Sequence, residues 1–105
     1  MKTLGFYVKG QKLSKKPSII FSTLIAGSSN FYEASFEFSP EWKNLTKVVK
    51  FGYGNVEEYI PLIQTTCNIP ERIMKLPTFY VSVIGVSDIT QVSTNSVVVK
   101  QKGAN

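Results

Sequence analysis

Side chains that could support catalysis are few and widely spaced along this sequence. The 105 residues include seven acidic residues, one cysteine and no histidine. Without imidazole the chain lacks the commonest general base, the usual partner of a nucleophilic Ser or Cys, and the commonest metal ligand. Carboxylates would have to converge in a cleft to act as a pair, yet most are predicted at solvent-facing positions: Glu33, Glu37, Glu41, Glu57 and Glu58. The sequence therefore predicts no catalytic, cofactor or metal site, and an enzyme is the least favoured class.

Two further features have a structural explanation. Cys67 is the only cysteine, so it cannot form an internal disulfide, and free cysteine is among the most often buried residue types. The run Gly52-Tyr53-Gly54 suggests a glycine-rich phosphate loop, but it lacks the third glycine and the following helix. Gly54-Asn55 instead provides the positive φ angles of a tight hairpin turn. We interpret Cys67 as a core residue and the glycine pair as part of a hairpin.

The formal net charge of +5 suits an anionic partner such as nucleic acid or an acidic protein surface. Five lysines fall within the first sixteen residues, close in sequence to Phe6, Tyr7 and Phe21: Lys2, Lys9, Lys12, Lys15 and Lys16. Basic grooves with stacking aromatic rings are typical of single-strand-binding barrels, although loop lysines also serve solubility alone. A small single-stranded nucleic-acid-binding β-barrel is therefore the alternative hypothesis, and nucleic acid is not the favoured partner.

Length and composition indicate one folded domain over residues 1–105. Hydrophobic residues make up 43% and charged residues 18%, which is typical of a packed globule. The longest apolar runs are far shorter than the roughly 18 residues of a membrane-spanning helix, so no membrane insertion is expected. Near the N-terminus, Lys9 and Lys12 interrupt any apolar region of a signal peptide, and no targeting signal is predicted.

Alternating apolar residues predict an all-β fold. The clearest case is 31–39, where Ala34, Phe36 and Phe38 share one face. Pro40 ends this strand, and a single helical turn then brings Trp42 and Leu45 to one side. A second single turn is predicted at 71–76, after Pro70. Seven or eight short strands are predicted in all, with Pro61 on an edge or at a bulge and the run at 78–86 in a central position; the ranges are 4–9, 18–26, 31–39, 46–53, 56–63, 78–86, 89–92 and 95–102.

Four motifs carry a resemblance to a known family: Phe36-x-Phe38-Ser39-x-Glu41-Trp42-x-x-Leu45-Thr46-Lys47-x-x-x-Phe51, Cys67-Asn68-Ile69-Pro70-Glu71, Phe79-Tyr80-Val81-Ser82-Val83-x-Gly85-Val86 and Ser93-Thr94-Asn95-x-Val97-x-Val99. Over residues 31–103 the chain resembles immunoglobulin-like virion domains of tailed bacteriophages, found at the N-terminus of baseplate upper proteins and in tail fibres and head fibres. The resemblance implies an immunoglobulin-like antiparallel β-sandwich that anchors a polypeptide to the phage particle. Relatives often continue past the position of Asn105, so a small accessory, decoration or attachment module is expected.

The resemblance also indicates which residues form the core, whereas the contact residues are predicted from the exposed faces and edges of the strands and from a basic loop expected at 11–17. The expected core signature is Phe36, Phe38, Trp42, Leu45, Phe51, Cys67, Val81 and Val83. Contact surfaces are expected on the basic loop, on the outward side of 47–53 and on the last strand, where an edge can pair with a neighbouring chain; the residues are Lys12, Lys15, Lys16, Val48, Lys50, Val97 and Val99. The expected function is a non-enzymatic structural component of the virion, made in the host cytoplasm. Its expected partners are other virion proteins, with homo-oligomers as an option.

Overall fold

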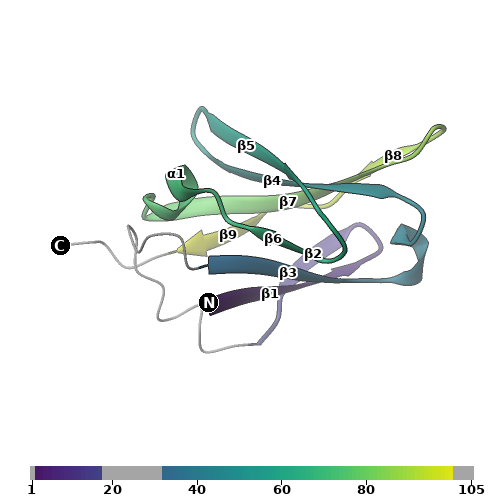
Figure 1. The fold of residues 1–105 in the computed structure, drawn as a ribbon, viewed down its shortest axis with the longest axis horizontal. Coiled ribbons are helices and arrows are strands. Elements are labelled where there is room, and N and C mark those ends of the chain that lie inside the picture. The colour runs from purple at the N-terminus through teal and green to yellow at the C-terminus, as the bar shows by residue number, and fades with distance from the viewer. Residues whose placement is uncertain (1, 18–31, 101–105) are drawn as a thin grey trace.

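The protein folds as a sandwich of two β-sheets, as the sequence predicts (Figure 1). A computed structural model of the protein describes residues 2–17 and 32–100. In chain order these residues form β1 (Lys2–Lys9), β2 (Lys12–Lys15), β3 (Tyr32–Phe38), the 3₁₀ turn η2 (Pro40–Trp42), β4 (Thr46–Tyr53), β5 (Val56–Pro61), β6 (Thr66–Asn68), α1 (Glu71–Met74), β7 (Thr78–Val86), β8 (Gln91–Ser93) and β9 (Val97–Lys100). The strand predicted at 18–26 lies outside the described residues.

The order of strands in each sheet places β7 in the centre, as predicted. One sheet has the order β2-β1-β3-β6, and the other has the order β5-β4-β7-β8, with β9 paired to β7 as well. The series β5-β4-β7-β9 is similar to strands C′, C, F and G of an immunoglobulin sandwich, and β6 beside β3 is similar to strand E beside B. Among the described strands β5 pairs with β4 alone, so Pro61 does lie on an edge strand.

Two details differ from the prediction. The region 11–17 was expected to be a loop, but it contains β2, which forms a hairpin with β1 through Gly10 at a φ of +59°. With the short β6, the hairpin raises the strand number of the described chain from the seven predicted there to nine. It also occupies one edge of β1, and β3 pairs with the other edge in parallel, from Lys2↔Tyr32 to Val8↔Phe38. The sandwich is therefore mixed rather than wholly antiparallel.

Aromatic rings from both sheets fill the core. Phe6 and Phe36 stack with their centroids 5.1 Å apart, and Phe51 meets Phe79 edge-on at 6.3 Å. The predicted core signature is confirmed: six of its members are buried, and the other two pack against them partly buried. The six are Phe36, Trp42, Phe51, Cys67, Val81 and Val83, and the two are Phe38 and Leu45.

Trp42 closes one end of the core. Pro40 begins the 3₁₀ turn, since its fixed φ suits the first helical position. The indole N–H of Trp42 donates a hydrogen bond of 2.7 Å to the carbonyl of Gly10. Its ring lies 5.4 Å from that of Phe38 and presses on the backbone at Gly85, where there is no room for a Cβ. The turn between β3 and β4 is thereby tied to the β1–β2 hairpin and to β7.

Asn95 joins the two sheets along one side. The N–H of Leu13 in β2 donates to Asn95 Oδ1 at 2.8 Å, and Asn95 Nδ2 donates to the Leu13 carbonyl at 3.1 Å. This side chain therefore satisfies the outer backbone groups of β2 as a neighbouring strand would. Next to it, Thr94 Oγ1 accepts a hydrogen bond of 2.9 Å from the N–H of Val83. This is the point at which the strand paired with β7 changes from β8 to β9.

Candidate interaction surface

The predicted contact residues fall on three separate parts of the sandwich. Lys12, Lys15 and Lys16 lie on or just after β2, Val48 and Lys50 on β4, and Val97 and Val99 on β9. The prediction for Val99 is wrong: this side chain is fully buried, because the alternation of β9 turns it into the core opposite Phe79. Val98 is the residue that faces outward, with 49% of its surface exposed, and Val97 is partly buried.

Val48 and Lys50 belong to the outer face of the larger sheet. Side chains at alternate positions of β4, β5 and β7 point away from the core on this side. We define the outer face by nine residues: Val48, Lys50, Glu57, Tyr59, Pro61, Tyr80, Ser82, Ile84 and Val86. Tyr59 is 51% exposed and Val86 is 38% exposed. Tyrosines beside aliphatic side chains are typical of protein-binding surfaces.

Lys50 is the centre of a polar network on the outer face. Its Nζ lies 2.9 Å from Glu57 Oε2 and 5.9 Å and 5.7 Å from the ring centroids of Tyr59 and Tyr80. Both tyrosine hydroxyls donate to the Glu57 carboxylate, at 3.3 Å and 3.2 Å. The Tyr80 ring lies across Gly52, where a Cβ would be 2.5 Å from the ring. The glycine thus allows the ring to lie flat, and the network holds it there.

The network changes the pKa values of its members. The hydrogen bond from Lys50 lowers the pKa of Glu57, and the same bond raises the pKa of Lys50. For Tyr80, burial is the main cause that raises the pKa, followed by the hydrogen bond to Glu57. A lowered carboxyl pKa stabilises the fold above the ordinary value of 4.5, and this stabilisation is lost as the pH falls through the lowered value.

This coupling predicts that the effect of Glu57→Gln on thermal stability depends on pH. The variant is expected to have a lower melting temperature than the wild type at pH 6–9, and the difference should disappear as the pH falls below the lowered pKa of Glu57, where the carboxyl group is neutral in both the folded and the unfolded state. Thermal melts followed by circular dichroism measure this. Glu71→Gln is the matched control, because Glu71 is exposed and lies 3.7 Å from Lys75 in a surface pair. A difference for Glu57→Gln that stays constant from pH 3 to 9 would contradict the role of the ion pair.

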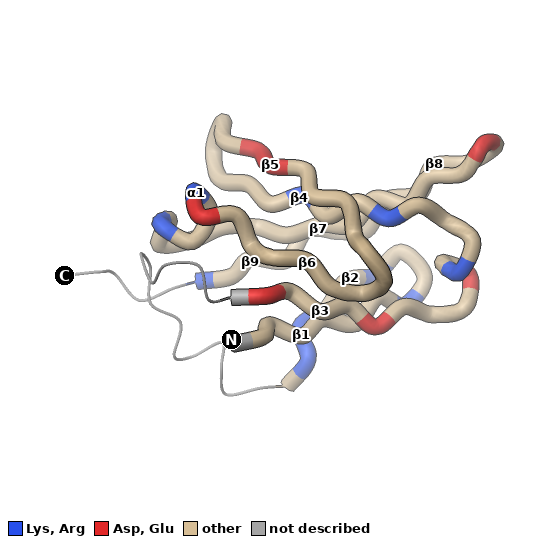
Figure 2. The backbone as a smooth tube through the Cα atoms, in the orientation of Figure 1, with Lys and Arg blue, Asp and Glu red and all other residues tan. Residues whose placement is uncertain are grey.

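The opposite sheet carries the basic surface. Lys9 and Lys16 place their ammonium groups 5.2 Å and 5.1 Å from the ring centroid of Tyr7, on the outward side of β1. Lys12 stands beside Lys9 in the β1–β2 register. Glu37 of β3 lies within this group and pairs with Lys16 at 3.3 Å. Figure 2 shows lysines on β1 and β2 and acidic residues on β3, so this surface is charged but not uniformly basic.

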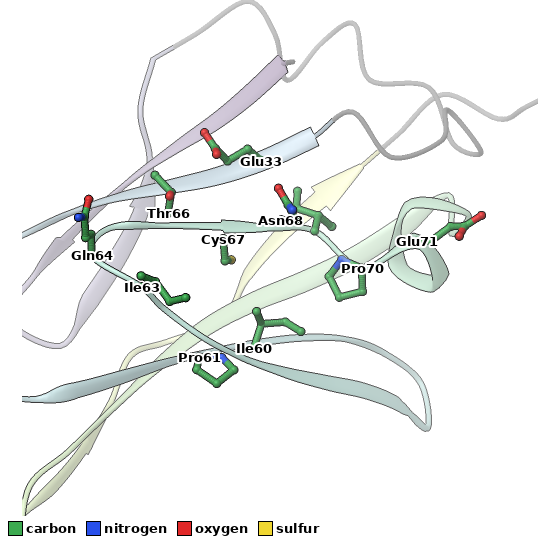
Figure 3. Close-up of a pocket in the computed structure, with 11 residues that line it drawn as sticks. Glu33, Ile60, Pro61, Ile63, Gln64, Thr66, Cys67, Asn68, Pro70 and Glu71 are labelled. Carbon is green, nitrogen blue, oxygen red and sulfur yellow. The ribbon is translucent and has the colours of Figure 1, made fainter.

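A solvent-open groove of about 820 Å³ lies between β5 and β6 (Figure 3). Five of its eleven lining residues are isoleucine or proline, namely Ile60, Pro61, Ile63, Ile69 and Pro70. Its two carboxylates, Glu33 and Glu71, stand at separate places and point away from each other (Figure 3). Within residues 2–17 and 32–100, no three Asp, Glu or Cys side chains gather as metal ligands would. The groove therefore lacks the convergent carboxylate pair that would support an enzyme.

Cys67 lines this groove but is nearly buried, with 9% of its surface exposed. Burial, with a smaller contribution from the charge of Glu33, raises the pKa of the thiol to about 12. The thiolate is the reactive form, so Cys67 is expected to react with Ellman's reagent at pH 8 at least 100-fold more slowly in the folded protein than in 6 M guanidinium chloride. Absorbance at 412 nm measures both rates. Equal rates would show that the cysteine is accessible and would remove it from the core.

The network residues that the sequence analysis missed are Glu57, Tyr59 and Tyr80. They come from β5 and β7 and meet Lys50 only through the strand register, so no local motif marks them. No helix in the described part of the chain is long and apolar enough to cross a membrane. In comparisons with known proteins, no family model matches the chain, and a search of curated proteins found no match either.

Proposed function

We propose that this protein is a non-enzymatic structural component of a tailed-phage virion. It would act as an accessory, decoration or attachment module of the head or of the tail and baseplate, made in the host cytoplasm and assembled with other virion proteins. The resemblance of the four motifs supports this assignment. Their aromatic and aliphatic residues form the centre of a two-sheet sandwich, with Trp42 at one end and Val81 and Val83 in the central strand.

The outer face is the observation that carries the proposal. It combines exposed Tyr59 and Val86 with a charge pair that is already satisfied within the chain. A partner that covered the pair would find each charge compensated, since Lys50 and Glu57 neutralise each other. The tyrosine rings need no further ordering because Glu57 and Gly52 hold them in place. A rigid surface of this kind suits binding to a protein.

Purified particles test the proposal. Lysates of infected host cells would be banded on a density gradient, and the particles probed with an antibody raised against this chain. We expect the chain to sediment with intact particles at a fixed copy number, and antibody-labelled electron micrographs to place it at one site, on the head or on the tail. If the protein is made during infection but stays in the unassembled fraction, it is not a component of the virion.

A single-stranded nucleic-acid-binding protein is the second candidate. The arrangement of Lys9 and Lys16 around the Tyr7 ring favours it, since lysine and aromatic side chains together bind phosphates and bases. Glu37 next to Lys16 opposes it by repelling phosphate. Fluorescence anisotropy with labelled oligonucleotides at 50 mM and 200 mM salt separates the two functions. A steep loss of affinity with salt would support nucleic-acid binding, and no affinity at low salt would exclude it.

A further inference from the structure

We propose that the outer face of β4, β5 and β7 pairs with the same face of a second copy of this chain, forming a two-fold symmetric dimer. The inference rests on the proposed function, in which this face binds protein, and it names the partner.

Charge favours this face over the opposite one for self-association. Two chains of net charge +5 repel each other, so copies meet most easily where the local charge is balanced. The outer face has two charged residues, Lys50 and Glu57, and they pair with each other at 2.9 Å. The other sheet presents Lys9, Lys12 and Lys16 on its outward side, against the acidic Glu33 and Glu37. Face-to-face contact through that sheet would bring its lysines together.

The larger sheet has enough area for a weak dimer. The nine residues of β7 extend over about 30 Å, and the three strands β4, β5 and β7 cover a width of about 14 Å. Contact over this whole area would bury roughly 420 Å² of each copy, which is typical of small, transient protein contacts. We therefore expect reversible association with a dissociation constant in the micromolar range or weaker, on the order of 10–100 μM.

The network favours isologous contact between like faces. A two-fold axis brings the same patch of each copy together, so each Tyr59 would lie against apolar residues of the second copy, such as Val48 or Ile84. Tyr59 is the most exposed of the three, with 51% of its surface exposed, whereas Val48 and Ile84 are partly buried. Exposed tyrosine rings of one copy that pack against the less exposed aliphatic side chains of the other provide the shape complementarity that packed sheets require.

Sedimentation equilibrium from 5 to 500 μM tests the dimer, with the wild type compared to Tyr59→Lys. The substitution removes the protruding ring and adds a positive charge that the two-fold axis would place near its own copy. We expect the apparent mass of the wild type to rise with concentration toward the mass of two chains. The dissociation constant of Tyr59→Lys should be at least 10-fold larger than that of the wild type. Tyr7→Lys is the matched control, because it makes the same change on the other sheet, and it should dimerise like the wild type.

Amide chemical shifts measured over the same dilution series locate the contact. They are expected to change with concentration in β4, β5 and β7 and to stay constant in β1, β2 and β3. A wild type that keeps the mass of one chain at 500 μM would overturn the inference, as would shift changes confined to β1–β3 or to the β9 edge. A monomer that is nevertheless found in purified particles would refute only the self-association, whereas a dimer absent from particles would refute only the virion role. Thermal melts of both variants confirm that they are folded.

Discussion

Replacing Gly85 by alanine is expected to destabilise the protein by about 2–3 kcal/mol, because the new methyl group has no space. A Cβ at this position would lie 2.5 Å from Cζ3 of Trp42 and 2.8 Å from Cδ1 of Leu45. Neither group can move aside easily: Trp42 is 1% exposed and hydrogen-bonded to Gly10, and Leu45 packs against the core. Urea denaturation followed by circular dichroism measures this loss of unfolding free energy. In a thermal melt, the melting temperature of the variant is expected to be lower by roughly 10–20 °C.

Gly5→Ala is the matched control for Gly85→Ala. Both glycines lie within strands that are paired on both edges, but a Cβ at Gly5 would meet only the flexible side chain of Lys16. That side chain can turn away, so Gly5→Ala should change the stability by less than about 0.5 kcal/mol. If the two substitutions have equal effects, then the tight contact of Gly85 with Trp42 does not exist in solution.

Replacing Trp42 by alanine is expected to have the largest effect of any single substitution considered, a loss of about 3–5 kcal/mol. The side chain is the largest among the fully buried ones, and its removal leaves a cavity next to Phe38 and Gly85. It also removes the indole hydrogen bond of 2.7 Å to the Gly10 carbonyl. Since small domains are stable by only about 5–15 kcal/mol, this loss is a substantial fraction of the native stability.

Two further variants serve as comparisons: one isolates the hydrogen bond of Trp42, and the other removes an aromatic ring that is not in the core. Trp42→Phe keeps most of the apolar volume but loses the hydrogen bond, and it should cost about 1–2 kcal/mol. Tyr59→Ala removes an aromatic ring that is half exposed and should cost less than about 1 kcal/mol. Circular dichroism follows the unfolding of all three, because the tryptophan fluorescence is lost in two of them. A cost for Trp42→Ala as small as that for Tyr59→Ala would contradict the role of Trp42 in closing the core.

The sequence predicted the core well where apolar and polar residues alternate. In β3 the pattern of Ala34, Phe36 and Phe38 gave the inward face directly, and Pro40 marked the end of the strand. The hairpin at Gly54 was also predictable, because its φ of +57° favours glycine. In β9 the alternation of apolar and polar residues could not be used. Three consecutive valines show no alternation, so the inward position of Val99 follows only from its pairing with Phe79.

Long-range pairing explains what the sequence did not predict. The strand β2 contains one apolar residue, Leu13, among lysines and a serine, so its local pattern is typical of a loop. Pairing with β1 and the side chain of Asn95, which is 82 residues away, hold it in the sheet. The Lys50 network likewise depends on register, since β4 aligns Lys50 with Tyr59 on one side and with Ser82 on the other.

We propose that this protein is a component of a phage particle and that the outer face of its larger sheet, the dimer contact, is needed for its incorporation. The most direct test is the particle-bound fraction of three chains, each supplied during infection by a phage in which the native copy is deleted. We predict that the wild type and Tyr7→Lys are recovered with purified particles at equal copy number, and that Tyr59→Lys is reduced at least 10-fold. Equal recovery of all three chains would show that the outer face is not needed for incorporation, and absence of the wild type would show that the protein is not a virion component.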